Sequence, residues 1–192
     1  MGQSAPLGGI FRRLGAADVA LFREHLIRLD PDTRRDRFAM GASDNFLARY
    51  AEQAFAGDAV LFGFVEAGRL RAVAELRPFD SREAEAAFSI ENEFRRRGLA
   101  TELFSRLITA ARNRRLRRLY MNCLAHNRAM QGLARKFSAE LTFESDSVLA
   151  IVTAPPGSPA SVMQEAGDAM GVFTTAILQL QGRWLGLTPF RR

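Results

Sequence analysis

One segment of the chain, from Ala84 to Arg112, constrains the fold most strongly, because three structural patterns follow one another in it without interruption. Residues 84–90 are small and apolar and predict a strand, residues 92–97 are polar and predict a loop, and residues 99–112 predict a helix. The helix carries a single apolar stripe, made of Ala100, Leu103, Phe104, Leu107, Ile108 and Ala111. A strand that leads through a short loop into a helix indicates a chain in which strands and helices alternate around a sheet.

The loop of this segment, Arg95-Arg96-Arg97-Gly98, is suited to bind an anion. The first backbone N–H groups of a helix have no acceptor within the helix, and the helix dipole is positive at that end. Together they form a ready site for a group such as a pyrophosphate. Gly98 allows a phosphate to approach the backbone closely, and Ala100 keeps the first turn thin. The alternative is an ordinary loop whose arginines point into water, and the residues alone do not decide between the two.

The rest of the chain continues the alternation of strands and helices. We expect Asp30-Pro31 to end the first helix, Ser43 to cap the second, and Ala67-Gly68 to turn a hairpin. The expected strands are 9–14, 59–66, 69–76, 84–90, 117–124, 142–143 and 148–153, and the expected helices are 16–29, 44–56, 99–112 and 129–137. This order predicts an α/β or α+β fold around a mixed sheet.

A second region follows this domain. We place the domain at residues 9–154, and at 155–192 a linker that starts with Pro155-Pro156-Gly157-Ser158-Pro159 and leads into an amphipathic helix from Ser161 to about Trp184. An apolar stripe runs along this helix, made of Val162, Met163, Ala166, Met170, Phe173, Ile177, Leu180 and Trp184. A stripe of this length is expected to be covered, either by the domain itself or by a second copy in a homodimer.

Composition narrows the partners and the location. The net charge is +6 and the pI near 10.8, but arginine supplies every basic residue except Lys136, and no aromatic interleaving or zinc-finger spacing accompanies the arginines. Nucleic acid is therefore not favoured as the main partner, although a basic surface attracts anionic phosphates. A structural metal site is not expected, because the chain has only one cysteine, Cys123, and two histidines, His25 and His126. The single cysteine indicates a reducing, cytoplasmic location. No apolar stretch is long enough for a membrane span.

Three sequence motifs resemble one known family. The run Arg95-x-x-Gly98-x-Ala100 resembles the signature of the GNAT superfamily of N-acetyltransferases. Residues 124–130, Leu-Ala-His-Asn-Arg-Ala-Met, followed by Leu-Ala-Arg-Lys at 133–136, resemble the asparagine at a strand end and the helix that follows it in that family. Leu29-Asp30-Pro31 with Arg34-Arg35 and Arg37-Phe38 is similar to the N-terminal helices of bacterial protein acetyltransferases of this type. Together the motifs extend from Ile10 to Thr153.

The resemblance implies the GNAT fold and acetyl-CoA as the co-substrate, with no metal. In that fold the fourth and fifth strands of a central mixed sheet, here 84–90 and 117–124, splay apart and the pantetheine arm lies between them. The implied ligands of acetyl-CoA are Phe88, Ser89 and Ile90 on the fourth strand, Arg95, Arg96, Arg97, Gly98, Leu99, Ala100 and Thr101 at the loop and helix start, and Asn127, Met130 and Arg135 on the opposite side. The implied acceptor is a primary amine, on a protein lysine or a small molecule.

Glu85 is the candidate general base for this reaction. An ammonium must lose a proton before it can attack a thioester, and a carboxylate can take that proton directly or through water. Strand alternation places Glu85 on one face with Ala87 and Ser89, which leaves room for a substrate. The spacing of Glu85 before Gly98 also resembles that of the catalytic glutamate in the protein-acetylating subgroup. The alternative is an exposed glutamate among the other acids of the segment, Glu83, Glu91 and Glu93.

Two departures leave the chemistry open. The tyrosine that often serves as general acid in the superfamily falls on Ala134, and Ser138-Ala139-Glu140 replaces the usual end of the last helix. His25 and His126 have no acidic or nucleophilic companion near them in the sequence, so nothing indicates a covalent intermediate, and we expect direct attack in a ternary complex. A module that binds acyl-CoA as a sensor or scaffold without turnover is the alternative function.

Overall fold

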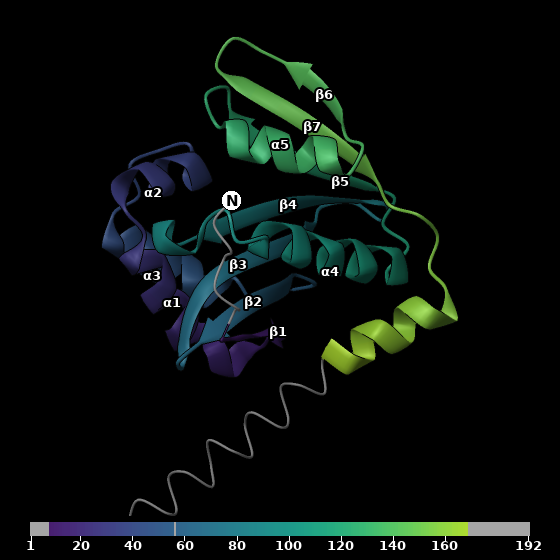
Figure 1. The fold of residues 1–192 in the computed structure, drawn as a ribbon, viewed down its shortest axis with the longest axis horizontal. Helices are drawn as coiled ribbons and strands as arrows, with labels where there is room; N and C mark the ends of the chain where they lie inside the picture. Colours follow the sequence, from purple (N-terminus) through teal and green to yellow (C-terminus); the bar gives the residue numbers. More distant parts are fainter. Residues whose placement is uncertain (1–7, 56, 169–192) are drawn as a thin grey trace, which may run out of the picture.

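Seven strands form one mixed sheet in the computed structural model, which describes residues 8–55 and 57–168 (Figure 1). Their order across the sheet is β1-β2-β3-β4-β5-β7-β6, and every neighbouring pair is antiparallel except β4 and β5. The strands are β1 Ile10–Leu14, β2 Val60–Glu66, β3 Arg69–Pro78, β4 Glu83–Ile90, β5 Arg118–Leu124, β6 Glu140–Phe143 and β7 Ser147–Thr153. The expected mixed sheet is thus confirmed.

Helices cover both faces of this sheet (Figure 1). They are the 3₁₀ turn η1 Ala16–Asp18, α1 Val19–Arg28, α2 Pro31–Phe38, α3 Asp44–Gln53, the 3₁₀ turn η2 Asn92–Phe94, α4 Leu99–Asn113 and α5 Arg128–Lys136. One core lies under α4 and α5, and a second lies under α1 and α3 on the opposite face. Ser43 caps α3 by accepting from the backbone N–H of Phe46, and Ala67 and Gly68 both take positive φ values, as a tight hairpin turn requires.

Helix α2 is absent from the helices expected from the sequence pattern, although the resemblance to N-terminal helices covered its residues. Asp30-Pro31 ends the preceding helix, as expected, but the same two residues also start the next one. Asp30 accepts from the backbone N–H of Thr33 (3.0 Å), and Pro31 occupies the first helical position, where its missing N–H costs nothing. The proline was interpreted only as a stop signal, although it is equally a start signal.

Strands β4 and β5 stay together over only a short distance. Residues 83–85 of β4 pair with residues 118–120 of β5, and Glu85 is the last residue of β4 in this parallel register. From Ala86 onward, β4 pairs with β3 alone among the described residues, so the backbone groups along its other edge have no strand partner. The two strands diverge there, which is the splayed arrangement that the resemblance implied.

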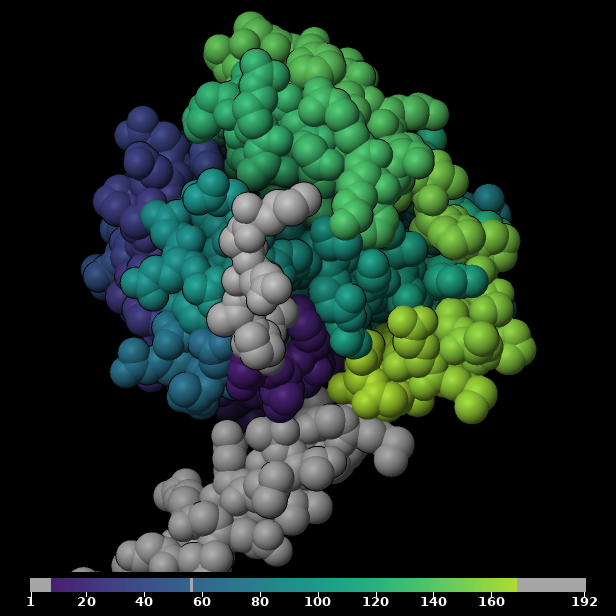
Figure 2. Space-filling model, viewed as in Figure 1, coloured from purple at the N-terminus to yellow at the C-terminus, as the bar shows by residue number. Residues whose placement is uncertain are grey.

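The described beginning of the C-terminal region lies against α4 (Figure 2). Residues 159–168 are helical, and polar contacts join them to α4 and the turn after it: Asn113 Nδ2 donates to the Ser161 carbonyl (3.0 Å), Arg114 pairs with Glu165 (2.6 Å), and Arg106 pairs with Asp168. The stripe positions Met170, Phe173, Ile177, Leu180 and Trp184 lie outside the described residues. None of the helices that the structure describes combines the length and the apolar character that a bilayer crossing requires.

A buried ionic cluster holds α2 and α3 on the sheet. Glu75 of β3 is fully buried, and its carboxylate accepts from Arg37 of α2 (2.6 Å), Tyr50 of α3 (2.9 Å) and its own neighbour Arg77 (2.7 Å). Burial by itself raises the pKa of Glu75, but the two guanidinium groups outweigh it and hold that pKa below its usual range. The carboxylate is therefore charged in the folded protein and joins three elements of the fold.

We expect Glu75→Ala to lower the free energy of unfolding by about 3–5 kcal/mol, because it leaves two arginines partly buried without their counterion. Chemical denaturation followed by circular dichroism measures this change. Glu52→Ala is the matched control, since Glu52 is exposed on α3 and should leave the denaturation midpoint unchanged. Equal midpoints for the two variants would contradict a stabilising role of the cluster.

Candidate active site

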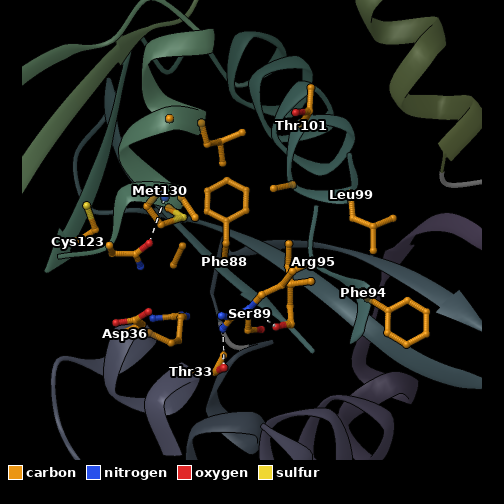
Figure 3. A pocket seen from close by; sticks show the side chains of 18 of the residues that line it. Thr33, Asp36, Phe88, Ser89, Phe94, Arg95, Leu99, Thr101, Cys123 and Met130 are labelled. Carbon is orange, nitrogen blue, oxygen red and sulfur yellow. Dashed lines mark hydrogen bonds between the residues drawn. The ribbon is translucent and has the colours of Figure 1, made fainter. Parts of the chain in front are cut away.

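A cavity of about 1010 Å³ lies where β4 and β5 diverge (Figure 3). β4 forms its floor, the loop 92–98 and the start of α4 form one wall, β5 and α5 form the opposite wall, and α2 closes one end. In Figure 3, Phe88 projects into the cavity between Met130 and Leu99, while Thr33 and Asp36 reach it from α2. The cavity is large enough for an extended ligand together with a second, smaller one.

The backbone of the loop before α4 is shaped to face an anion. Arg96 and Gly98 both adopt left-handed conformations, with φ of 59° and 82°. Gly98 is the N-cap of α4 and has no side chain to accept from the first helical N–H groups, so these donors remain available at the wall of the cavity. Arg95 is held back against α2, where its Nη2 donates to the Thr33 hydroxyl (2.6 Å).

Most of the candidate ligand residues line this one cavity. They are Phe88, Ser89, Ile90, Arg95, Arg96, Gly98, Leu99, Ala100, Thr101, Asn127 and Met130, and the candidate base Glu85 lines it as well. Two segments that are far apart in the sequence, 85–101 and 127–130, therefore meet at one place.

Arg97 and Arg135 lie outside the lining. The guanidinium of Arg97 stacks on the outer side of Phe94, 4.9 Å from the ring centroid, and Arg135 is exposed on α5. Lys136, one residue further along α5, lines the cavity, and its Nζ lies 3.3 Å from the hydroxyl of Thr101 at the start of α4. One position along a helix rotates a side chain by about 100°, which the sequence motif alone did not resolve.

The Asn127 side chain organises the opposite wall. Its Oδ1 accepts from the backbone N–H of Met130 (3.1 Å), so Asn127 is the N-cap of α5. This cap sets the direction of α5 and turns Met130 toward the cavity (Figure 3). Ala134, where the resemblance would place a tyrosine, is buried in the core under α5.

Both histidines have partners that come from distant segments, which their neighbours in the sequence did not reveal. Buried His25 of α1 lies 2.9 Å from the Ser89 hydroxyl through Nε2 and 3.5 Å from Glu91 through Nδ1. Burial raises the pKa of Glu91, but hydrogen bonds from His25, Arg71 and Arg28 outweigh it and lower that pKa to about 2. The Ser89 hydroxyl is thus hydrogen-bonded to His25 of α1. The contacts of His25 with Ser89 and Glu91 join α1 to the sheet.

The second histidine spans the end of the cavity. His126, in the turn between β5 and α5, lies 2.8 Å from Asp36 of α2 through its Nε2. Thr33, Asp36 and Arg37 were not candidates in the sequence analysis, because α2 was not recognised as a helix. The Asp30-Pro31 start signal, followed by the spacing of these three residues, could have identified the face that they share.

The comparison with protein families identifies the family of the chain. Residues 24–138, more than half of the chain, match the model of the Acetyltransferase (GNAT) family. The chain belongs to the GNAT acetyltransferase family. The protein is therefore an acetyl-CoA-dependent N-acetyltransferase. No curated protein sequence is significantly similar to the chain.

Solved structures share the fold at low sequence identity. The GNAT domain of PAT from S. lividans is 18% identical, with a TM-score of 0.65, over 76% of this chain and 90% of that one. A GNAT phosphinothricin acetyltransferase from Sinorhizobium meliloti, in complex with AcCoA, is 16% identical, with a TM-score of 0.59 over 79% and 91%. A ribosomal-protein-alanine N-acetyltransferase from Brucella melitensis is 17% identical, with a TM-score of 0.58 over 74% and 97%. Their different acceptors leave the acceptor of this GNAT protein open.

We expect Gly98→Val to weaken acetyl-CoA binding at least tenfold, which is about 1.4 kcal/mol. A valine disfavours the left-handed backbone at this position, and its side chain would occupy the open space where the phosphates approach. Isothermal titration with acetyl-CoA measures the change. Gly68→Val is the matched control, because Gly68 also has a positive φ (73°) and open space around it but lies in the hairpin turn away from the cavity. Unchanged affinity in folded Gly98→Val would exclude this loop as the phosphate site.

Proposed function

We propose that this GNAT enzyme transfers the acetyl group of acetyl-CoA to a primary amine by direct attack in a ternary complex, with Glu85 as the general base. The observation that carries the proposal is the position of Glu85. It is the last β4 residue paired with β5, so its exposed carboxylate lies at the point where the two strands part and the cavity begins.

The proposed path of acetyl-CoA follows the unpaired edge of β4. The pyrophosphate lies against the backbone N–H groups of the loop from Arg95 to Gly98 and the first turn of α4, with Lys136 adding a positive charge. The pantetheine arm takes hydrogen bonds from the β4 backbone groups of Phe88 and Ile90, which face the edge that has no strand partner among the described residues, whereas the backbone of Ser89 between them faces β3. Asn127 and Met130 line the other side, and Arg97 and Arg135 contribute only to the surrounding positive potential.

Four other carboxylates lie near the cavity, and their partners or their positions make them weaker candidates for the base. Glu91 is bound by two arginines and has its pKa lowered to about 2, so it is a poor proton acceptor. Glu83 pairs with Arg118 and lies outside the lining. Asp36 is engaged by His126, and Glu93 lies at the loop end of the cavity, beside the proposed phosphate site.

The reaction then needs few groups. Glu85, directly or through a water molecule, takes a proton from the ammonium of the acceptor. The neutral nitrogen attacks the thioester carbonyl carbon, a C–N bond forms, and the C–S bond breaks. β4 backbone N–H groups stabilise the oxygen on which negative charge develops. As the tetrahedral intermediate collapses, the nitrogen loses its second proton and the leaving CoA thiolate takes up one proton, so the products are an N-acetyl amine, the CoA thiol and the first proton, held by Glu85.

Two assays separate this enzyme from a sensor that binds acyl-CoA without turnover. Isothermal titration measures acetyl-CoA binding, and release of the CoA thiol measures turnover on a panel of amines that includes lysine peptides and small molecules. Binding with turnover on at least one amine supports the proposal. Binding without turnover on the whole panel favours the sensor.

The location and the assembly of the protein are also proposals. The lone Cys123, which is buried, supports a reducing compartment such as the cytoplasm. The exposed side chains of Val162 and Met163, 56% and 77% accessible, continue the apolar stripe of the C-terminal region and support a homodimer through it. Light scattering on the full chain and on a chain truncated after Pro155 tests the dimer. A dimer through this region requires twice the chain mass for the full chain, and a single chain mass or aggregation for the truncated form.

We expect Glu85→Gln to lower kcat by about 10²–10⁴-fold, because glutamine keeps the shape of the side chain but cannot accept the proton. The affinity for acetyl-CoA should stay nearly constant, and raising the pH should partly restore the rate because more of the amine is already neutral. Steady-state kinetics on an amine that the wild type acetylates provides the measurement.

The matched control for this variant is Glu83→Gln, two residues away on the same face of β4 but outside the cavity lining. Its kcat should remain close to that of the wild type. A near-normal kcat for Glu85→Gln at pH 7 would move the base to another group and leave the fold assignment intact.

A further inference from the structure

We propose that the acceptor is a small amine that carries a carboxylate, and that Arg37 recognises this carboxylate. The inference rests on the proposed function, since it names the acceptor class for the same site. It begins with the placement of Arg37 on α2, at the end of the cavity to which Glu85 also belongs.

Arg37 is a buried side chain with a contact to the cavity. Only 9% of the side chain is accessible, yet it contributes to the cavity lining. Its Nη2 donates to Glu75 Oε1 (2.6 Å) and to the Tyr50 hydroxyl (2.5 Å), which fixes the guanidinium in place. A group held in this way is already oriented when a ligand arrives, so its binding requires little ordering of the side chain.

The guanidinium keeps donors that the protein does not use. It carries five N–H groups, of which two belong to Nη2. Within residues 8–55 and 57–168, the Nε of Arg37 is enclosed without an acceptor, and no hydrogen bond uses its Nη1. The enclosed Nε is out of reach of a ligand, as are the Nε atoms of Arg12, Arg71 and Arg106, so the Nη1 donors of Arg37 are the ones available to acceptor atoms of a ligand in the cavity that this side chain lines.

The charge of the surrounding cluster also points to an anion. Arg37 and Arg77 both bond to Glu75, and no second carboxylate is bonded to either arginine in the part of the chain that the structure describes. Both Glu75 oxygens already accept hydrogen bonds, from Arg37 on one side and from Tyr50 and Arg77 on the other. The hydrogen-bonded groups of the cluster therefore carry one positive charge in excess, which the charge of the Glu85 carboxylate offsets as long as no ammonium is bound to Glu85.

Glu85 supplies the opposite charge at the same end of the cavity. It lies directly across from Arg77 in the β3–β4 register, on the face of the sheet that bears Glu75. An amino group at Glu85 and a carboxylate at Arg37 would each meet their counter-charge, as the two ends of an amino acid require. A lysine side chain within a protein offers only the amino group and would leave the excess charge of Arg37 unpaired.

The test compares pairs of amines that differ only in one group. Free amino acids and their carboxamides are assayed as acceptors of the wild-type enzyme. In each case kcat/KM is calculated from the concentration of the unprotonated amine. We expect the carboxylate form to be favoured at least tenfold. Arg37→Gln should reduce this preference to near unity, and Arg37→Lys should restore part of it, because lysine replaces the charge but not all the donors.

Arg34→Gln is the matched control. Arg34 is on the same helix, but its guanidinium pairs with Asp44 and with backbone carbonyls outside the cavity lining, so the preference for the carboxylate should remain. Thermal unfolding and acetyl-CoA titration verify that each variant is folded. If Arg37→Gln fails to fold, the preference of the wild type and of Arg37→Lys decides.

The outcomes distinguish the inference about the acceptor from the proposed function on which it rests. Turnover on carboxamides or lysine peptides that equals or exceeds turnover on the free acids would overturn the inference and leave the proposed function standing. A preference that survives in folded Arg37→Gln would also overturn it. Binding of acetyl-CoA without turnover on any amine would remove the proposed function and this inference together.

Discussion

The short pairing between β4 and β5 is the constraint on which the rest of this structure depends. Three residues of each strand keep the parallel register, and beyond Glu85 the strands separate. Backbone groups without a strand partner need hydrogen bonds from elsewhere, so the separation creates both the cavity and a row of donors and acceptors along its floor. Under the proposed function, acetyl-CoA occupies this edge and bonds to the backbone groups that lack a strand partner.

The start of α4 complements this edge with charge. The loop from Arg95 to Gly98 turns through two left-handed residues and leaves the first N–H groups of the helix facing the cavity. Its arginines differ in role despite their identical chemistry: Arg95 is bound to Thr33, while Arg97 stacks on Phe94. In the proposed phosphate site the backbone and the helix dipole would therefore supply the specific contacts, and the arginine side chains a more general positive potential.

The Glu75 cluster costs desolvation free energy, so its contribution to packing alone does not explain its presence. Burying a carboxylate between two guanidinium groups requires desolvation that often cancels the attraction, so a hydrophobic core at this place could be equally stable. The cluster does, however, hold α2 against β3 and keep the Arg37 guanidinium charged and immobile at the cavity. A buried polar arrangement next to a site is consistent with selection for binding geometry as well as for stability.

The sequence by itself determined the local features, since periodicity, caps and turns act over a few residues: the order of strands and helices, the Ser43 cap, the hairpin at Ala67-Gly68 and the loop before α4. Helix α2 was missed because Asp30-Pro31 carries both a stop and a start signal. Only the tertiary structure decided which side chains meet, such as Arg37 with Glu75, His25 with Ser89, and Asp36 with His126 across 90 positions of sequence. Such contacts depend on how the sheet and its helices pack, and sequence spacing does not encode that packing in any local pattern.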